Sequence, residues 1–153
     1  MLSRYRFFLQ LQCSSNLATL EHQPFDWNGE SIRTLNSLRS LEPLDVSFED
    51  LVAKLAGFPR MFVEMDGSFV WRGEFDNHVW QIDGLIHDQS GNVQYVEVKG
   101  TATWDAWVEF SNLLVEQRDR LVVNLVDRGV VTWVSEIERI LWGRDLQNES
   151  TRV

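Results

Sequence analysis

The stretch WQIDGLIHDQSGNVQYVEVKG, residues 80–100, indicates two β-strands joined by a polar turn. Apolar and polar residues alternate along both arms, which is the pattern of strands that bury one face. The link DQSGN, residues 88–92, is rich in turn-forming residues. The alternation places Asp83 on the first arm, and Glu97 and Lys99 on the second, on the same side of a sheet. These three charged side chains are the main chemical signal in the chain.

Length and composition favour a single folded domain. The chain has 153 residues, of which 44% are hydrophobic, enough to bury a sizeable core. We expect a mixed α/β (α+β) domain with a central, mostly antiparallel sheet built on hairpins and flanked by helices. The domain would span residues 1–153, with residues 1–46 either part of it or an extension on a core of residues 47–142.

Two further features of the sequence bear on the cellular compartment of the protein. No stretch approaches the length of apolar sequence that a membrane helix needs. Cys13 is the only cysteine, so the chain cannot form an internal disulfide. This fits a reducing compartment, and we expect a cytoplasmic protein. With no second cysteine and no histidine nearby in the sequence, Cys13 is expected to be a buried structural thiol.

Local patterns predict the remaining elements. Helices are expected where apolar residues recur every three or four positions after a capping residue, and hairpins where turn residues separate alternating arms. In chain order, the patterns predict a strand with Tyr5, Phe7, Leu9 and Leu11 on one face, a short helix over residues 30–41, a helix capped by Ser47, a hairpin around Asp66-Gly67, a polar loop over residues 73–78, a helix over residues 104–118 capped by Thr103, strands over residues 121–126 and 130–134, and a last helix over residues 135–142 capped by Ser135.

The order of elements after Ser47 carries a family resemblance. A helix and strands precede a strand with Asp83, a strand with Glu97-Val98-Lys99, a helix and a further strand. Over about residues 47–126, this resembles the core of the restriction-endonuclease-like superfamily, whose signature is PD-(D/E)XK. The residue before Asp83 is Ile82, so the proline of the signature is absent.

The resemblance implies metal-dependent hydrolysis of phosphodiester bonds in nucleic acid. Asp83 and Glu97 would bind Mg²⁺ or Mn²⁺, and the main-chain carbonyl of Val98 would help. Lys99 would stabilise the nucleophile or the developing charge, and Glu49 would be an extra acidic group. Mg²⁺ prefers oxygen ligands and keeps several waters, so one or two carboxylates suffice. The bound metal lowers the pKa of a water and neutralises charge on the phosphate.

Net charge weighs against a nucleic-acid partner. The formal charge is −9 and the isoelectric point is about 4.7, so the chain tends to repel phosphate backbones. Binding would need a local arginine cluster or a bridging metal ion. A second interpretation of Asp83, Glu97 and Lys99 is a solvated face of an antiparallel sheet, with Lys99 paired to an acid on a neighbouring strand.

Tryptophan content suggests another class of function. Most of the seven tryptophans should lie in the core, because large aromatic side chains dominate cores. Exposed tryptophans would instead form a surface that binds sugar rings or a partner protein. The alternative function is therefore a non-catalytic protein-interaction or ligand-binding domain with a Trp-rich surface. The candidates for that surface are Trp71, Trp80, Trp104 and Trp107.

One more group of polar residues has metal-ligating side chains. Glu74, Asp76 and His78 alternate in the sequence, and carboxylate and imidazole groups together can coordinate a metal ion. The other interpretation of these residues is an ordinary polar loop leading into the central hairpin.

Overall fold

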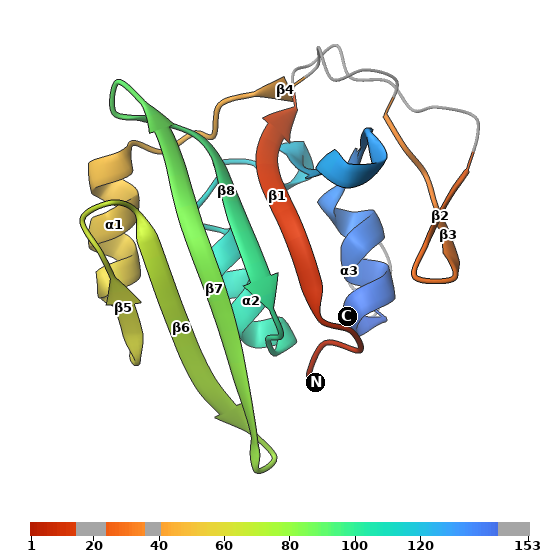
Figure 1. Cartoon of the computed structure of the whole chain (residues 1–153), viewed down its shortest axis with the longest axis horizontal. Coiled ribbons are helices and arrows are strands. Elements are labelled where there is room, and N and C mark those ends of the chain that lie inside the picture. The colour runs from red at the N-terminus through yellow and green to blue at the C-terminus, as the bar shows by residue number, and fades with distance from the viewer. Residues whose placement is uncertain (15–23, 36–40, 144–153) are drawn as a thin grey trace.

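The computed structural model describes residues 1–14, 24–35 and 41–143. They form a mixed α+β fold in which helices lie behind a long antiparallel sheet (Figure 1), so the expected fold class is confirmed. No helix in these ranges has the length and apolar character to cross a membrane. The strands are β1 (Phe7–Ser14), β2 (Phe25–Trp27), β3 (Glu30–Ile32), β4 (Leu41–Glu42), β5 (Met61–Val63), β6 (Ser68–Phe75), β7 (His78–Gln89), β8 (Asn92–Gly100), β9 (Leu121–Leu125) and β10 (Val130–Trp133). The helices are α1 (Phe48–Ala56), α2 (Trp104–Ser111) and α3 (Val134–Trp142), with short 3₁₀ turns over Arg118–Arg120 and Val126–Arg128.

The main sheet has the strand order β10-β9-β1-β8-β7-β6-β5, and β4 pairs with the end of β1. All of these pairs are antiparallel. The meander β5 to β8 follows the chain, whereas β1 lies between β8 and β9. β1, which belongs to the first 46 residues, is therefore an inner strand of the main sheet. The short strands β2 and β3 form a separate hairpin.

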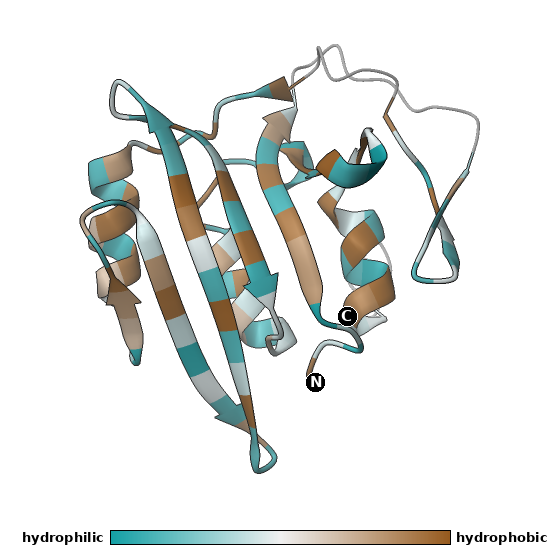
Figure 2. Cartoon of the chain, viewed as in Figure 1, coloured by the Kyte–Doolittle hydropathy of each residue, from teal (hydrophilic) through white to brown (hydrophobic). Residues whose placement is uncertain are grey.

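The central hairpin is confirmed as β7 and β8. Its strands extend further than the two expected arms, because only Ser90 and Gly91 form the turn, with φ angles of 55° and 86°. Asp83 pairs with Lys99, and Leu85 pairs with Glu97. Bands of opposite hydropathy alternate along both strands (Figure 2), as a sheet with one buried face requires.

The core lies between the sheet and the three helices. Side chains of one face of β1, β6, β7, β8 and β9 pack against α1, α2 and α3. Trp107 and Trp142 are fully buried there, and their rings lie 5.4 Å apart. Aromatic pairs of this kind add to the energy of apolar burial.

The expectation that most tryptophans lie in the core is confirmed, and the alternative Trp-rich surface is not formed. Five tryptophans are buried, and Trp27 and Trp133 are half-buried against neighbouring apolar side chains. The physical reason is the side of the sheet on which they lie. Trp71 and Trp80 point from β6 and β7 toward the helices, where their rings pack edge-on at 5.0 Å.

Two of the three predicted helix caps, Ser47 and Thr103, are confirmed. The Ser47 hydroxyl accepts a hydrogen bond from the Asp50 amide at 3.1 Å, and α1 begins at the next residue. The Thr103 hydroxyl accepts from the Ala106 amide at 3.2 Å and begins α2. Each bond satisfies an amide that has no partner within the helix.

The hairpin between β5 and β6 is also confirmed. The Asp66 carboxylate accepts hydrogen bonds from the amide and the hydroxyl of Ser68 at 2.9 and 2.7 Å. The Ser68 hydroxyl and amide lower the pKa of Asp66, because both bonds favour its ionised form. Gly67 follows with a φ of 93°. These local bonds fix the turn and the register of the two strands.

The predicted loop over residues 73–78 is wrong. β6 continues to Phe75 and β7 begins at His78, so only Asp76 and Asn77 form the turn, with φ angles of 51° and 66°. Asparagine and aspartate tolerate this left-handed conformation, which tight hairpin turns require. Glu74, Asp76 and His78 thus lie on a strand, in a turn and on the next strand. Within the described ranges, no three His, Cys, Asp or Glu side chains gather as metal ligands.

The predicted helix over residues 30–41 is wrong where the structure describes it; residues 36–40 lie outside the described residues. Asn28-Gly29 forms the turn between β2 and β3. The chain then stays extended because distant groups satisfy its main chain. The Arg33 amide donates to Glu136 Oε1 at 2.8 Å, and the Leu35 amide donates to the carbonyl of Val131 at 2.7 Å.

Several element boundaries differ from the expected ones, and β9 and β10 each end one residue earlier than predicted. Tyr5 precedes β1 and is exposed, whereas Phe7, Leu9 and Leu11 are buried as expected. The helix α2 ends at Ser111 instead of residue 118, and the Ser111 hydroxyl donates to the carbonyl of Trp107, a bond that competes with regular helix geometry. The last helix begins at residue 134 without a side-chain cap, so Ser135 lies inside it.

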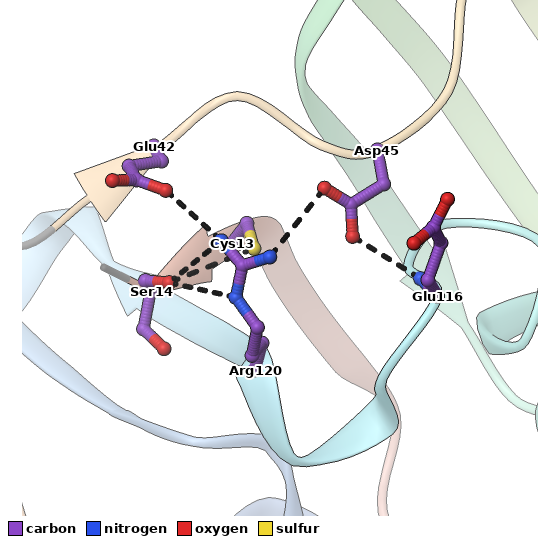
Figure 3. Close-up of polar contacts among 6 residues, drawn as sticks. All are labelled: Cys13, Ser14, Glu42, Asp45, Glu116 and Arg120. Carbon is purple, nitrogen blue, oxygen red and sulfur yellow. Dashed lines mark hydrogen bonds and ion pairs between the residues drawn. The ribbon is translucent and has the colours of Figure 1, made fainter. Parts of the chain in front are cut away.

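Arg120 joins three segments at the end of β1 (Figure 3). Its guanidinium donates to the carbonyl of Ser14 at 3.2 and 3.3 Å and pairs with Glu42 at 2.9 Å and Asp45 at 3.7 Å. The other Asp45 oxygen accepts from the Glu116 amide at 3.1 Å. Because the partners of Arg120 come from β1, β4 and the loop before α1, Arg120 fixes the segment around residues 41–45 against the sheet.

Cys13 lies beneath this cluster and is fully buried, as expected. Burial raises the pKa of its thiol, although the nearby Arg120 guanidinium acts in the opposite direction. A thiol that is both buried and protonated reacts slowly, because the thiolate is the nucleophile.

We expect Cys13 of the folded protein to react very slowly with the disulfide reagent DTNB at about pH 8, and to react fully in concentrated urea. Arg120→Met should raise the rate in the folded protein by about tenfold or more, because it releases the segment that covers the thiol. Absorbance of the released thiolate measures the rate. Rapid labelling of the wild-type protein without urea would contradict the prediction.

Candidate functional site

On one side of the main sheet, none of the helices that the structure describes lies over β6, β7, β8 and β1 (Figure 1). We call the side chains that these strands direct away from the helices the open face. At the β9 and β10 end, Leu35 and Leu41 cover the same side of the sheet and pack on Val122 and Val131. The open face consists of Phe8, Gln10, Gln12, Ser68, Val70, Arg72, Glu74, Val79, Gln81, Asp83, Leu85, His87, Tyr95, Glu97 and Lys99.

A shallow hollow of about 230 Å³ lies near the middle of the open face. Phe8 and Leu85 provide its large apolar side chains, and Asp83, Glu97 and Lys99 provide its charges. Ser68, Gly84 and Val98 complete the lining. The three charged residues predicted to share a side of the sheet do so, and they border one depression.

Register and hydrogen bonds define the geometry of these charges. Asp83 lies directly across from Lys99, and Glu97 lies two pairs further along β8, across from Leu85. Asp83 Oδ1 accepts from Gln81 Nε2 at 2.8 Å, and Gln81 Oε1 accepts from Arg72 Nε at 2.9 Å. This relay orients one oxygen of the Asp83 carboxylate.

The other carboxylate has a different partner. Glu97 Oε1 lies 3.6 Å from His87 Nε2, and the His87 ring stacks on Tyr95 at 4.2 Å. Stacking holds the imidazole beside Glu97, which therefore faces away from Lys99 along the strands. Within the described residues, the Lys99 side chain makes no ion pair or hydrogen bond.

Two other residues named with this group, Val98 and Glu49, do not direct a metal-ligating group into the hollow. β8 pairs with β1 and β7 on either side of Val98, so its main-chain carbonyl lies in the plane of the sheet and points toward a neighbouring strand. Glu49 is exposed on α1, behind the opposite face of the sheet. The structure brings together Asp83, Glu97 and Lys99 and leaves Glu49 apart.

Phe8 and Leu85 were not identified as site residues from the sequence. Phe8 has a signal there: it is a large apolar residue at an outward position of a strand whose inward positions are also apolar. Its side chain is 58% exposed. Its proximity to Lys99 depends on the pairing of β1 with β8, which joins residues far apart in the chain.

Glycine at position 84 has a local structural role. A Cβ there would overlap the ring of Phe69, which packs beneath the strand on the helix side. The absence of a side chain lets Phe69 fill the core directly under the hollow.

In comparisons with protein families, with curated proteins and with solved structures, none matches this chain.

Proposed function

We propose that this chain is a non-catalytic interaction module that binds a protein partner through the open face. The observation that carries the proposal is the hollow itself, which lies in a sheet face that none of α1, α2 and α3 covers. Exposed apolar side chains next to a few fixed polar groups are typical of recognition surfaces.

The residues that line the hollow favour binding of a partner over catalysis. Among the described residues that line it, the hydroxyl side chain belongs to Ser68, which donates to Asp66 Oδ1 and forms no hydrogen bond with a described histidine. Glu97 is paired with His87, and Asp83 accepts from Gln81. These contacts hold the carboxylates in place, as a binding surface requires.

The lining also defines the chemistry of the occupant. Phe8 and Leu85 offer apolar contact, and two carboxylates outnumber the single ammonium. A partner that presents an aromatic ring beside a cationic group would satisfy both features, because the ring covers apolar surface while the cation approaches Asp83.

Nuclear magnetic resonance titration tests this proposal with phenethylammonium, which combines a ring with a cation. We expect its amide shifts to cluster at the hollow and to weaken in Leu85→Asp, which removes apolar contact. Phenylacetate, with the same ring and the opposite charge, should bind several-fold more weakly. Glu109→Gln, an exposed change on α2, is the matched control and should leave the titration unchanged. Shifts scattered over the surface, or equal binding of the two probes, would contradict the proposal.

A second candidate function is metal-dependent phosphodiester hydrolysis, as the family resemblance implies. The observation in its favour is that Asp83, Glu97 and Lys99 line one hollow from neighbouring strands. Two carboxylates suit Mg²⁺ or Mn²⁺, which keep several waters. Lys99 would then stabilise charge on the phosphate of a nucleic acid. The net charge of −9 opposes binding of such a polyanion.

The same spectra recorded with Mn²⁺ discriminate between the two candidates. A metal site would broaden the amide signals around Asp83 and Glu97 at micromolar to millimolar Mn²⁺, and Asp83→Ala would abolish the effect. The interaction module predicts no selective broadening there.

A further inference from the structure

The charge of the open face differs from that of the rest of the protein. Its outward positions carry three acidic residues, Glu74, Asp83 and Glu97, and two basic ones, Arg72 and Lys99. The chain as a whole carries a net charge of −9, so nearly all of the excess negative charge lies elsewhere. Two copies of this chain repel each other least where these nearly balanced faces meet.

One row of side chains runs from β5 across the open face, and its order of apolar and charged residues is complementary to the same row in a second copy. Strand pairing aligns Phe62 with Val70, Val70 with Asp83, Asp83 with Lys99, and Lys99 with Phe8. The row therefore has apolar residues at both ends and one acid next to one base near its centre. Phe62 and Phe8 are 69% and 58% exposed.

A two-fold axis parallel to the strands, between β7 and β8, makes this row complementary to its own copy. The axis brings Asp83 opposite Lys99 of the second copy, and Lys99 opposite Asp83 of the second copy. It also brings Val70 of each copy opposite Phe8 of the other copy. Symmetric dimers use one patch on both copies in this way, and close opposite charges at an interface give specificity.

The groups at the centre are able to make these contacts. Asp83 Oδ1 accepts from Gln81, whereas no described residue donates to Oδ2. Lys99 has no ion pair or hydrogen bond from its side chain within the described residues. Glu97, which would lie opposite the second copy's Leu85, is turned toward His87 at 3.6 Å.

Sheet geometry favours contact near the axis. Stacked sheets lie about 10 Å apart and cross at about 30° because each is twisted. The rows thus diverge with distance from the axis, and Asp83 and Lys99 lie in the two strands beside it. Asp83 and Lys99 therefore lie closer to the residues that face them than any other pair in the row.

We propose that the protein forms a two-fold symmetric dimer in which the open faces of two copies pack together, with Asp83 of each copy paired with Lys99 of the other. This inference rests on the proposed function and specifies its partner as a second copy of the same chain. Lys99 of the second copy supplies the cation that faces Asp83 in the hollow, and Phe8, its neighbour in register, places an aromatic ring beside the hollow, opposite Val70.

Sedimentation equilibrium from about 10 µM to about 1 mM tests the dimer. Asp83→Lys and Lys99→Asp should each weaken association about tenfold or more, because each places like charges opposite one another. Equimolar mixing of the two variants should give a heterodimer, since every facing pair is again opposite in charge. The double variant Asp83→Lys/Lys99→Asp should dimerise as the wild type does. Circular dichroism confirms that each variant is folded.

Mixing is the decisive step, because a purely structural effect of either substitution cannot restore association between two different chains. A wild-type protein that stays monomeric would overturn the inference, as would a dimer insensitive to both single variants. Glu109→Lys, a charge reversal on an exposed part of α2, is the matched control. If the chain is monomeric but phenethylammonium still binds the hollow, the dimer fails and the interaction module stands. If neither association nor probe binding is seen, both fail.

Discussion

Gly100→Ala is expected to lower the free energy of unfolding by at least about 3 kcal/mol. Gly100 ends β8 with a φ of 137°, a conformation that alanine adopts only with strain. An added Cβ would overlap the carbonyl oxygen of Gln81 and lie 3.3 Å from the Ile82 Cα. These are main-chain atoms of β7, so no side-chain rotation can relieve the overlap. The Thr101 amide donates to the same carbonyl at 3.0 Å, and this bond would be lost too.

Urea unfolding followed by tryptophan fluorescence and circular dichroism measures the effect. Gly57→Ala is the matched control, because Gly57 has a φ of −78° and its added Cβ would lie 3.4 Å from the Lys54 carbonyl oxygen. That change should stay within about 1 kcal/mol of the wild type. A Gly100→Ala protein that unfolds at the wild-type urea concentration would show that β7 and β8 do not approach so closely.

Glu138→Ala is expected to destabilise the protein by about 3–5 kcal/mol, the usual result of removing one member of a buried ion pair. Glu138 is fully buried on α3. Its Oε2 accepts a hydrogen bond from Trp107 Nε1 at 2.7 Å and pairs with Arg118. Without the carboxylate, the indole N–H and a guanidinium only 17% exposed would lose this acceptor in an apolar surrounding.

Thermal unfolding should show a fall in midpoint of about 6–20 °C for Glu138→Ala. Glu138→Gln keeps an acceptor for Trp107 and should lose less stability than Glu138→Ala. Glu109→Ala removes an exposed acid from α2 and should change stability by no more than about 0.5 kcal/mol. Equal midpoints for Glu138→Ala and Glu109→Ala would mean that the buried pair adds nothing to folding.

Features set by neighbouring residues could be predicted from the sequence. The alternation in residues 80–100 predicted β7, β8 and the shared side of Asp83, Glu97 and Lys99, because side chains of a strand alternate regardless of what covers it. Ser47 and Thr103 were identified as caps because their bonds reach only three residues ahead. The residues that cause each of these features lie within a few positions of it in the sequence.

Features set by distant residues could not be predicted. Ile32 and Leu35 have a spacing that also fits a helix, but Glu136 and Val131 hold this segment extended across about one hundred residues of sequence. The hollow was missed for the same reason, since Phe8 reaches Lys99 only through the pairing of β1 with β8.

The position of β1 has a consequence for how the protein forms during synthesis. The ribosome makes β1 first, yet its neighbours β8 and β9 begin at Asn92 and Leu121. Apart from its short pairing with β4, the strand must wait about eighty residues for β8 and longer for β9, and loop closure of this length slows folding. The meander β5 to β8 pairs in chain order and can assemble as it emerges. The inner strand therefore joins late, and its insertion links the meander to β9 and β10 in one cooperative step.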